Sequence, residues 1–173
     1  MTFSIKSAVR GWVAPQHRIY CKSRRWQWIV GELEKRGRQC HEAGVFLLGV
    51  ERHGRREVTK TIFYDELDPV AYSTGVCILH GEAFAKLWAI CREHQLTVVA
   101  DVHTHPGAAL QSWSDKTNPM VAHAGHIAII VPNFAVGVTR VEQLGIYEYC
   151  GNHTWINHTH PKTRNFFYTG FWS

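Results

Sequence analysis

Apolar residues recur along the chain with two spacings, one helical and one typical of strands. From Trp26 to Gly37 they fall three or four positions apart, and the closing glycine is typical of a helix end. The same spacing predicts a second amphipathic helix over Gly81–His94. A third, short helix is expected over Ser114–Ala124, after a polar loop.

Short runs rich in apolar and β-branched residues separate these helices and predict buried strands. Arg52–Arg56, which contains Gly54, reads as the turn of a hairpin, and the polar stretch Asp65–Ser73 as a loop. The predicted strands are Ala43–Val50, Glu57–Tyr64, Leu96–Val102, Gly125–Pro132 and Leu144–Cys150, with Thr154–Asn157 pairing with the last. This order predicts an α/β fold with one mixed β-sheet sandwiched by helices, in a single domain over residues 1–173.

The composition is that of a globular protein. Hydrophobic residues make up 45% of the 173 residues and charged residues 19%, so the chain can bury a core. No apolar run approaches the roughly 20 residues that cross a bilayer. Met1–Arg18 lacks the continuous apolar stretch of a secretory signal. We therefore expect a cytoplasmic protein with no membrane partner.

The net charge of +5 comes from short basic runs. Such runs usually form solvated faces, although they can also attract nucleic acid. No recognition motif accompanies them, so a nucleic-acid partner is not expected. The runs lie at Arg18–Arg25, Lys35–Arg38 and Arg52–Arg56.

The cysteines predict neither disulfides nor a thiolate metal site. There are five, their spacings are wide, and no C-x-x-C pair occurs. Free thiols, mostly buried, are expected. A nucleophilic thiol would be sought first at Cys40, next to His41 and Glu42.

The segment from Asp101 to Asp115 carries the chemistry. His103 and His105 are two positions apart at the end of a predicted strand, so both can approach one cation. Pro106 and the glycine after it turn the chain, and the following loop can return Asp115 to the same point. Two imidazoles and one carboxylate form a zinc site whose fourth position is left for water, as in catalytic centres.

Glu42 and Ser112 complete a candidate hydrolytic site. Glu42 stands at the mouth of a buried strand, where a carboxylate needs a task or a partner, and it is the candidate general base. Ser112 can donate a hydrogen bond to an oxyanion. Other readings of the single residues stay open: the histidines can satisfy each other, Asp115 or Ser112 can cap a helix, and Glu42 can pair with an arginine.

Together these residues resemble the JAMM motif of the JAB/MPN metallopeptidases, over about residues 20–150. The matching segments are Glu42-x-Gly44-x-x-Leu47-x-Gly49, His103-x-His105-Pro106 and Ser112-x-x-Asp115. The resemblance implies an MPN/JAB, cytidine-deaminase-like fold with one Zn²⁺ per chain on His103, His105 and Asp115. It also implies that Glu42 is the base and that Ser112 is the oxyanion donor.

The function implied by this resemblance is that of a deubiquitinase-like zinc isopeptidase. Such enzymes hydrolyse the bond after the C-terminal tail of a ubiquitin-like protein, and their bacterial members often occur in operons for ubiquitin-like conjugation, whose other products are possible partners. The substrate tail would add as a strand at the sheet edge near Asp65–Gly75. The alternatives are a non-catalytic MPN scaffold and a JAB peptidase for other substrates, such as cell-wall or phage-tail peptides or a carrier protein that releases cysteine.

Three further features lie in the C-terminal half of the sequence. Nine residues, 106–114, separate His105 from Asp115, one fewer than is usual in the family, and the shortening lies within Gly107–Gln111. A second H-T-H-P string, His158–Pro161, lacks a following Ser-x-x-Asp and has basic neighbours, so we do not expect it to bind metal. The aromatic residues of the tail are expected to pack on the body: Phe166, Phe167, Tyr168, Phe171 and Trp172.

Overall fold

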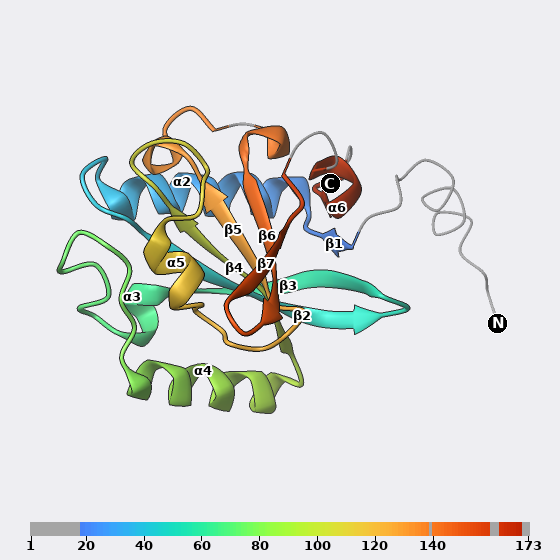
Figure 1. Cartoon of the computed structure of the whole chain (residues 1–173). Coiled ribbons are helices and arrows are strands. Elements are labelled where there is room, and N and C mark those ends of the chain that lie inside the picture. Colours follow the sequence, from blue (N-terminus) through green and yellow to red (C-terminus); the bar gives the residue numbers. More distant parts are fainter. Residues whose placement is uncertain (1–17, 139, 160–162, 171–173) are drawn as a thin grey trace.

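The computed structural model describes residues 18–138, 140–159 and 163–170. They form one curled eight-stranded mixed sheet with helices on both faces (Figure 1). The strands are β1 (Ile19–Tyr20), β2 (Gly44–Arg52), β3 (Arg55–Phe63), β4 (Thr97–Thr104), β5 (Ile127–Val131), β6 (Gly145–Gly151), β7 (Thr154–Asn157) and β8 (Phe167–Tyr168). The helices are α2 (Ser23–Gly37), α3 (Tyr64–Leu67), α4 (Gly81–His94), α5 (Trp113–Thr117) and α6 (Thr163–Phe166), with 3₁₀ turns at Asn133–Ala135 and Val141–Gln143.

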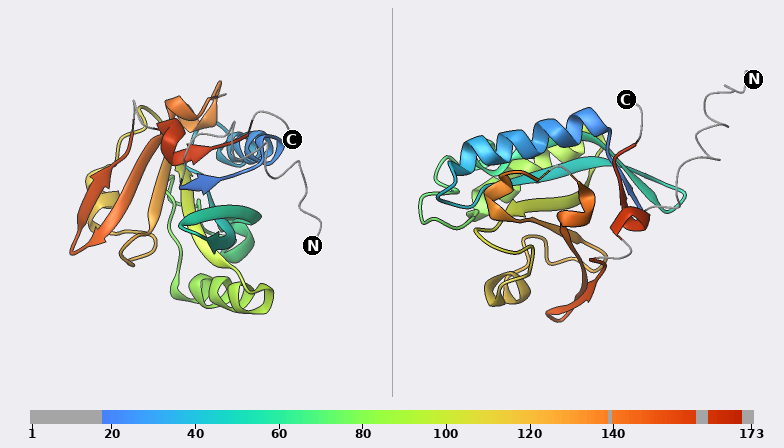
Figure 2. Two further views of the ribbon diagram at one scale, coloured as in Figure 1. Left: turned by 90° about the vertical axis from the view of Figure 1, so that its right-hand side faces the viewer. Right: turned by 90° about the horizontal axis from the view of Figure 1, so that it is seen from above.

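The strand order is β7-β6-β5-β4-β2-β3-β1-β8. Neighbouring strands are antiparallel except at β4–β5, β3–β1 and β1–β8, which are parallel. The sheet curls, so that β6 and β7 turn away from the β2–β3 hairpin (Figure 2). In the middle of the sheet, Gly44 of β2 lies opposite His103 of β4. The central strand β4 thus carries the first predicted metal ligand.

Two apolar cores cover the two faces of the sheet. On one face α2 buries Trp26, Ile29 and Leu33 against strand residues that include Val45 and Val102. On the other face α4 buries Leu87 and its neighbours in a core with Phe46, Leu48 and Tyr64. The helical periodicity read from the sequence therefore marks the faces that α2 and α4 bury.

Most predicted elements are confirmed, with small shifts at their ends. Helix α4 and strand β7 have the predicted limits, and β7 pairs with β6. The hairpin turn has His53 and Gly54 at positive φ, as a tight two-residue turn requires. Strand β4 continues through His103 to Thr104 rather than stopping before the histidine.

Two predicted elements were wrong in extent. The helix expected over Ser114–Ala124 is the single short helix α5, which ends at Thr117. Pro119 follows closely and disfavours helical backbone at the residue before it. The stretch expected as a loop after β3 begins with α3, where the Glu66 carboxylate accepts a 2.8 Å hydrogen bond from the Phe63 N–H.

The sheet edge expected near Asp65–Gly75 is the outer side of β3. The segment itself consists of α3 and turns and contains no strand. On β3, strand β1 pairs with Arg56 and Glu57 alone, so within the described chain the rest of β3 has no strand on that side. One bond to it comes from a side chain, Arg25 Nη1 to the Val58 carbonyl at 2.6 Å.

The predicted packing of the aromatic tail holds where the structure describes it. Phe166 and Phe167 are buried, and the Phe167 ring meets Trp26 edge to face at 4.8 Å between centroids. Phe171 and Trp172 lie outside the described residues. No helix in the described part of the chain combines the length and apolarity that a membrane crossing needs.

Candidate metal centre

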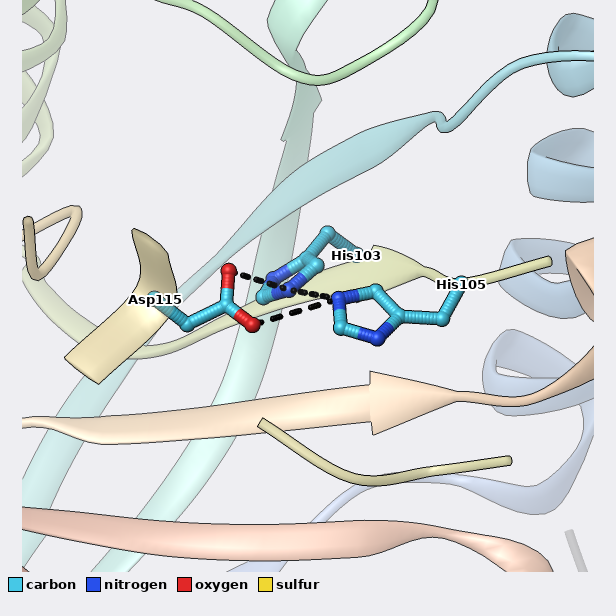
Figure 3. Close-up of side chains that lie close together, drawn as sticks. All are labelled: His103, His105 and Asp115. Carbon is cyan, nitrogen blue, oxygen red and sulfur yellow. Dashed lines mark hydrogen bonds and ion pairs between the residues drawn. The ribbon is translucent and has the colours of Figure 1, made fainter. Parts of the chain in front are cut away.

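Strand β4 places two buried histidines side by side. The Nε2 atoms of His103 and His105 lie 3.1 Å apart (Figure 3). The His105 backbone is fixed by hydrogen bonds from its N–H to the Val131 carbonyl at 2.9 Å and from the Phe134 N–H to its carbonyl at 2.8 Å. Both imidazoles therefore rest on the rigid centre of the sheet, as the two-residue spacing predicts.

Helix α5 brings Asp115 to the histidines. Its Oδ2 lies 3.3 Å from His105 Nε2, and its Oδ1 lies 3.6 Å from His103 Nε2 (Figure 3). Ser112 caps the helix: its Oγ accepts a bond from the Asp115 N–H at 3.1 Å, and its own N–H donates to Asp115 Oδ2 at 2.7 Å. The short loop thus still delivers the carboxylate, and this capping box sets its orientation.

The loop between His105 and Asp115 is anchored on β6 and β7. Tyr147 donates a hydrogen bond from its hydroxyl to the Ala109 carbonyl at 3.0 Å. Trp155 donates from its indole nitrogen to the Lys116 carbonyl at 3.1 Å. A side chain at Gly145 would overlap the Ala109 carbonyl, so glycine is needed there for the loop to lie this close. Two strands far along the chain therefore hold the third candidate ligand in place.

The three side chains have the separations that a tetrahedral metal requires. Zn–N and Zn–O bonds of about 2.0–2.2 Å at tetrahedral angles place ligand atoms about 3.3 Å apart. Here the corresponding separations are 3.1, 3.3 and 3.6 Å. In the described part of the chain these residues form the only group of three or more histidine, cysteine or acidic residues arranged to hold one ion. The residues therefore fit a divalent metal with an open position.

The electrostatics of the cluster favour a positive charge at its centre. Burial lowers the pKa of His103, but hydrogen bonds and charge interactions with Asp101 and Asp115 outweigh it and raise the pKa to about 10. Burial raises the pKa of Asp115, but its bonds to His103 and His105 hold it far below the usual range. A proton fills the need for positive charge in the metal-free protein, and a metal ion can replace it.

Glu42 lies beside this cluster, as predicted. Its Oε1 is 3.8 Å from His105 Nε2, and its Oε2 accepts a 3.2 Å hydrogen bond from the Cys77 N–H. Its own N–H donates to the Gly75 carbonyl at 3.0 Å. Among the described residues it forms no ion pair with an arginine. One carboxylate oxygen is thus fixed by the backbone while the other faces the histidines.

Strand β4 also holds the segment that carries Glu42. Thr104, between the two histidines, accepts a 2.9 Å hydrogen bond on Oγ1 from the Ala43 N–H, and its own N–H donates to the Ala43 carbonyl at 2.9 Å. The candidate base and the candidate ligands are therefore tied together by hydrogen bonds between the last residue of β4 and the residue that precedes β2.

Ser112 is exposed, and its Oγ serves the helix cap. An oxygen that accepts one hydrogen bond keeps its own hydrogen to donate. The structure thus shows the capping role that the sequence left open, and the oxyanion role remains a prediction. Cys40 is exposed, and its described contact is a long hydrogen bond to the Gly37 carbonyl.

A second group of residues beneath His103 was not predicted. Asp101 is 1% exposed and accepts hydrogen bonds from His103 Nδ1 at 3.3 Å, the Tyr64 hydroxyl at 3.2 Å and His126 Nε2 at 2.6 Å. Burial raises its pKa, but the two histidines more than offset this and hold it below the usual value. A lone aspartate inside an otherwise apolar strand was the available signal.

The second H-T-H-P string has a different setting. His158 lies 2.9 Å from Glu148 Oε2 and stacks on the Phe166 ring at 4.3 Å. The Glu148 carboxylate also binds Arg18 through both oxygens, at 2.6 and 3.0 Å. His160 lies outside the described residues.

Comparisons with known proteins include a relative whose name states an activity. No protein-family profile matches the sequence. The chain is 28% identical over 108 residues to the probable metalloprotease y4jG of Sinorhizobium fredii, a match that covers 62% of this chain and 66%, just under two thirds, of that protein.

Solved structures that match this chain include the two that follow. Protein DSY2949 from Desulfitobacterium hafniense has a TM-score of 0.56 and 13% identity, covering 82% of this chain and 90% of that one. A protein from Salinibacter ruber has a TM-score of 0.48 and 18% identity, covering 78% and 90%. At 13% identity, the likeness to DSY2949 concerns the fold alone.

Proposed function

We propose that this chain is a zinc-dependent peptidase of the JAB/MPN type, with one metal ion on His103, His105 and Asp115. The observation that carries the proposal is the group of three ligand atoms at metal-binding separations, with Glu42 Oε1 3.8 Å from His105 Nε2. The name of the relative, a probable metalloprotease, supports it independently. The motif resemblance and the mixed α/β sheet are consistent with an MPN-like domain.

The residues divide the work of amide hydrolysis between them. A bound zinc polarises the scissile carbonyl and lowers the pKa of water from about 15.7 to about 7. Glu42 Oε1 accepts the proton of the attacking water and passes it to the leaving amine, so the amide and water become an acid and an amine. The Cys77 N–H holds Oε2 and keeps Oε1 directed at the site. The Ser112 hydroxyl donates a hydrogen bond to the oxyanion.

The proposed substrate is the C-terminal tail of a ubiquitin-like protein or its conjugates. This substrate assignment rests on the motif resemblance, as do the bacterial operon partners. The proposed cytoplasmic location rests instead on the absence of a membrane-length or secretory-type apolar stretch from the sequence. The outer side of β3, unpaired by a strand beyond Glu57 in the described chain, offers backbone groups to an extended tail. Phe63 at its end lies opposite Val45, three positions after Glu42, so a tail there would point toward the site.

The test is hydrolysis of a ubiquitin-like protein fused through its C-terminus to a reporter. Glu42→Gln is expected to lower kcat by roughly 10²–10⁴-fold and to leave one zinc per chain, because it removes the base and spares the ligands. The matched control is Glu82→Gln, an exposed glutamate of α4, which should cleave at the original rate.

Full cleavage by the Glu42→Gln variant would exclude the assigned base. A protein that holds zinc but cleaves neither this fusion nor unrelated peptides would favour the scaffold alternative. Cleavage of peptides other than the fusion would retain the peptidase and reject the ubiquitin-like substrate.

A further inference from the structure

The buried carboxylate of Asp101 lies directly beneath the candidate metal centre. Asp101 and His103 are two residues apart in β4 and face the same side of the sheet. Oδ2 of Asp101 lies 3.3 Å from His103 Nδ1, and the Nε2 atom on the far side of that ring faces His105 and Asp115. The imidazole is therefore held between a carboxylate on one nitrogen and the metal position on the other.

We propose that Asp101 is a positioning residue that fixes the ring and the tautomer of His103 for metal binding. When Asp101 accepts the Nδ1–H, the neutral ring keeps its lone pair on Nε2, which is the atom that points at the metal position. A carboxylate behind a metal-binding histidine also makes it a better ligand. This inference rests on the proposed metal site and adds a residue outside the motif.

The position of Asp101 is fixed by two further side chains. His126 precedes β5, and its Nε2 donates a hydrogen bond to Asp101 Oδ1 at 2.6 Å. The hydroxyl of Tyr64 donates to Asp101 Oδ2 at 3.2 Å. The backbone of His126 is itself held, since the Tyr149 N–H donates to its carbonyl at 2.8 Å. All three side chains are buried, so water does not compete for these bonds.

Gly44 makes room for this arrangement. It pairs with His103 across β2 and β4, and a Cβ at this position would overlap the Tyr64 ring. With glycine there, the ring lies over β2 and its hydroxyl reaches Asp101. The glycine two positions after Glu42 thus has a steric role in the same network, although its backbone needs no unusual φ.

The test compares zinc-loaded Asp101→Asn with the unmodified protein. We expect zinc affinity, measured by competition with a chelator, to fall about 10–100-fold. In nitrogen-15-labelled histidine spectra, the His103 Nδ1 proton should lose its downfield, slowly exchanging signal. A role confined to packing would change neither reading once folding is confirmed by circular dichroism.

Asp68→Asn is the matched control. Asp68 also accepts a hydrogen bond from a histidine, His80 Nδ1 at 2.6 Å, but it has no described contact with the metal cluster. The zinc affinity of the Asp68→Asn variant should equal that of the unmodified protein. If Asp101→Asn does not fold, Tyr64→Phe removes one hydrogen bond to the same carboxylate, and about a five-fold loss of affinity is expected.

The outcomes separate this inference from the proposed function. If His103→Ala and Asp115→Ala keep their zinc, the metal site itself is wrong. If those variants lose zinc while Asp101→Asn binds it within two-fold of the original with an unchanged Nδ1 signal, the positioning role alone is overturned.

Discussion

At the scale of single residues, the centre concentrates opposite charges in a small buried volume. His103 lies between two carboxylates, Asp101 at 3.3 Å and Asp115 at 3.6 Å. In the metal-free protein a proton on the imidazole balances them, because it is retained up to a pH of about 10 rather than 6.5. The same proton must leave before Nε2 can bind a metal.

This shift predicts how the stability of the metal-free protein depends on pH. Between pH 6.5 and about 10 the folded chain keeps the proton on His103, whereas the unfolded chain has released it. The free energy of unfolding should therefore decrease as pH rises through that window. Denaturant unfolding at a series of pH values measures it. His103→Gln should flatten the curve between these limits, and zinc-saturated protein should not show the decrease. Constant stability of the metal-free chain would contradict the prediction.

At the scale of elements, β2 and β4 share the work of holding base and ligands. Thr104 stands between the two histidines and binds the backbone of Ala43, the residue after Glu42. A glycine accounts for another motif position: a Cβ at Gly49, where the pairing of β2 with β3 shifts register, would overlap the Glu57 carbonyl of β3. Part of the motif therefore builds the strands that present the chemistry.

Thr104→Val tests this coupling between elements. It leaves a buried Ala43 N–H without its acceptor, which should lower the free energy of unfolding by about 1–3 kcal/mol. It should also lower kcat on the fusion substrate, because the segment that carries Glu42 loses the hydrogen bond between Ala43 and the Thr104 hydroxyl. Zinc affinity should stay unchanged. Thr97→Val is the control, since that exposed residue donates its hydroxyl to the Gly49 carbonyl at 3.3 Å. Equal effects of the two variants would argue against a specific role of the Thr104–Ala43 hydrogen bond.

At the scale of the whole molecule, segments from the two ends of the described chain complete one side of the sheet. Strand β8 pairs with β1 in parallel, and Phe167 is fully buried against Trp26 of α2. The metal cluster lies at β4 and the loop beyond it, separated from β8 by three intervening strands. The aromatic tail thus stabilises the fold and takes no part in the described site.

Phe167→Ala should separate stability from metal binding. Removing a buried phenylalanine is expected to lower the free energy of unfolding by about 3–5 kcal/mol. Zinc affinity at low temperature, where the variant remains folded, should match that of the original protein. Chemical unfolding and chelator competition measure the two quantities. A variant of unchanged stability would show that the tail is dispensable.

Local pattern predicts what depends on neighbouring residues, and the motif resemblance also predicts that the distant Glu42 lies beside the histidines. Other contacts between distant residues were missed. Helices α2 and α4 follow from local periodicity, and the histidine pair follows from alternation along one strand. The sheet order does not, because the β1–β8 pairing joins segments far apart in the chain. The Asp101 network also escaped prediction, since Tyr64 and His126 approach it only when the four strands β5, β4, β2 and β3 are assembled.

The carboxylate of Asp115 serves two purposes with one atom. Its Oδ2 accepts the Ser112 N–H that starts α5 and also lies 3.3 Å from His105 Nε2. Metal binding and formation of this short helix are therefore expected to be thermodynamically linked. We therefore expect removal of the ion to destabilise α5, and a partner that stabilises α5 to raise the affinity for the ion by the same free energy.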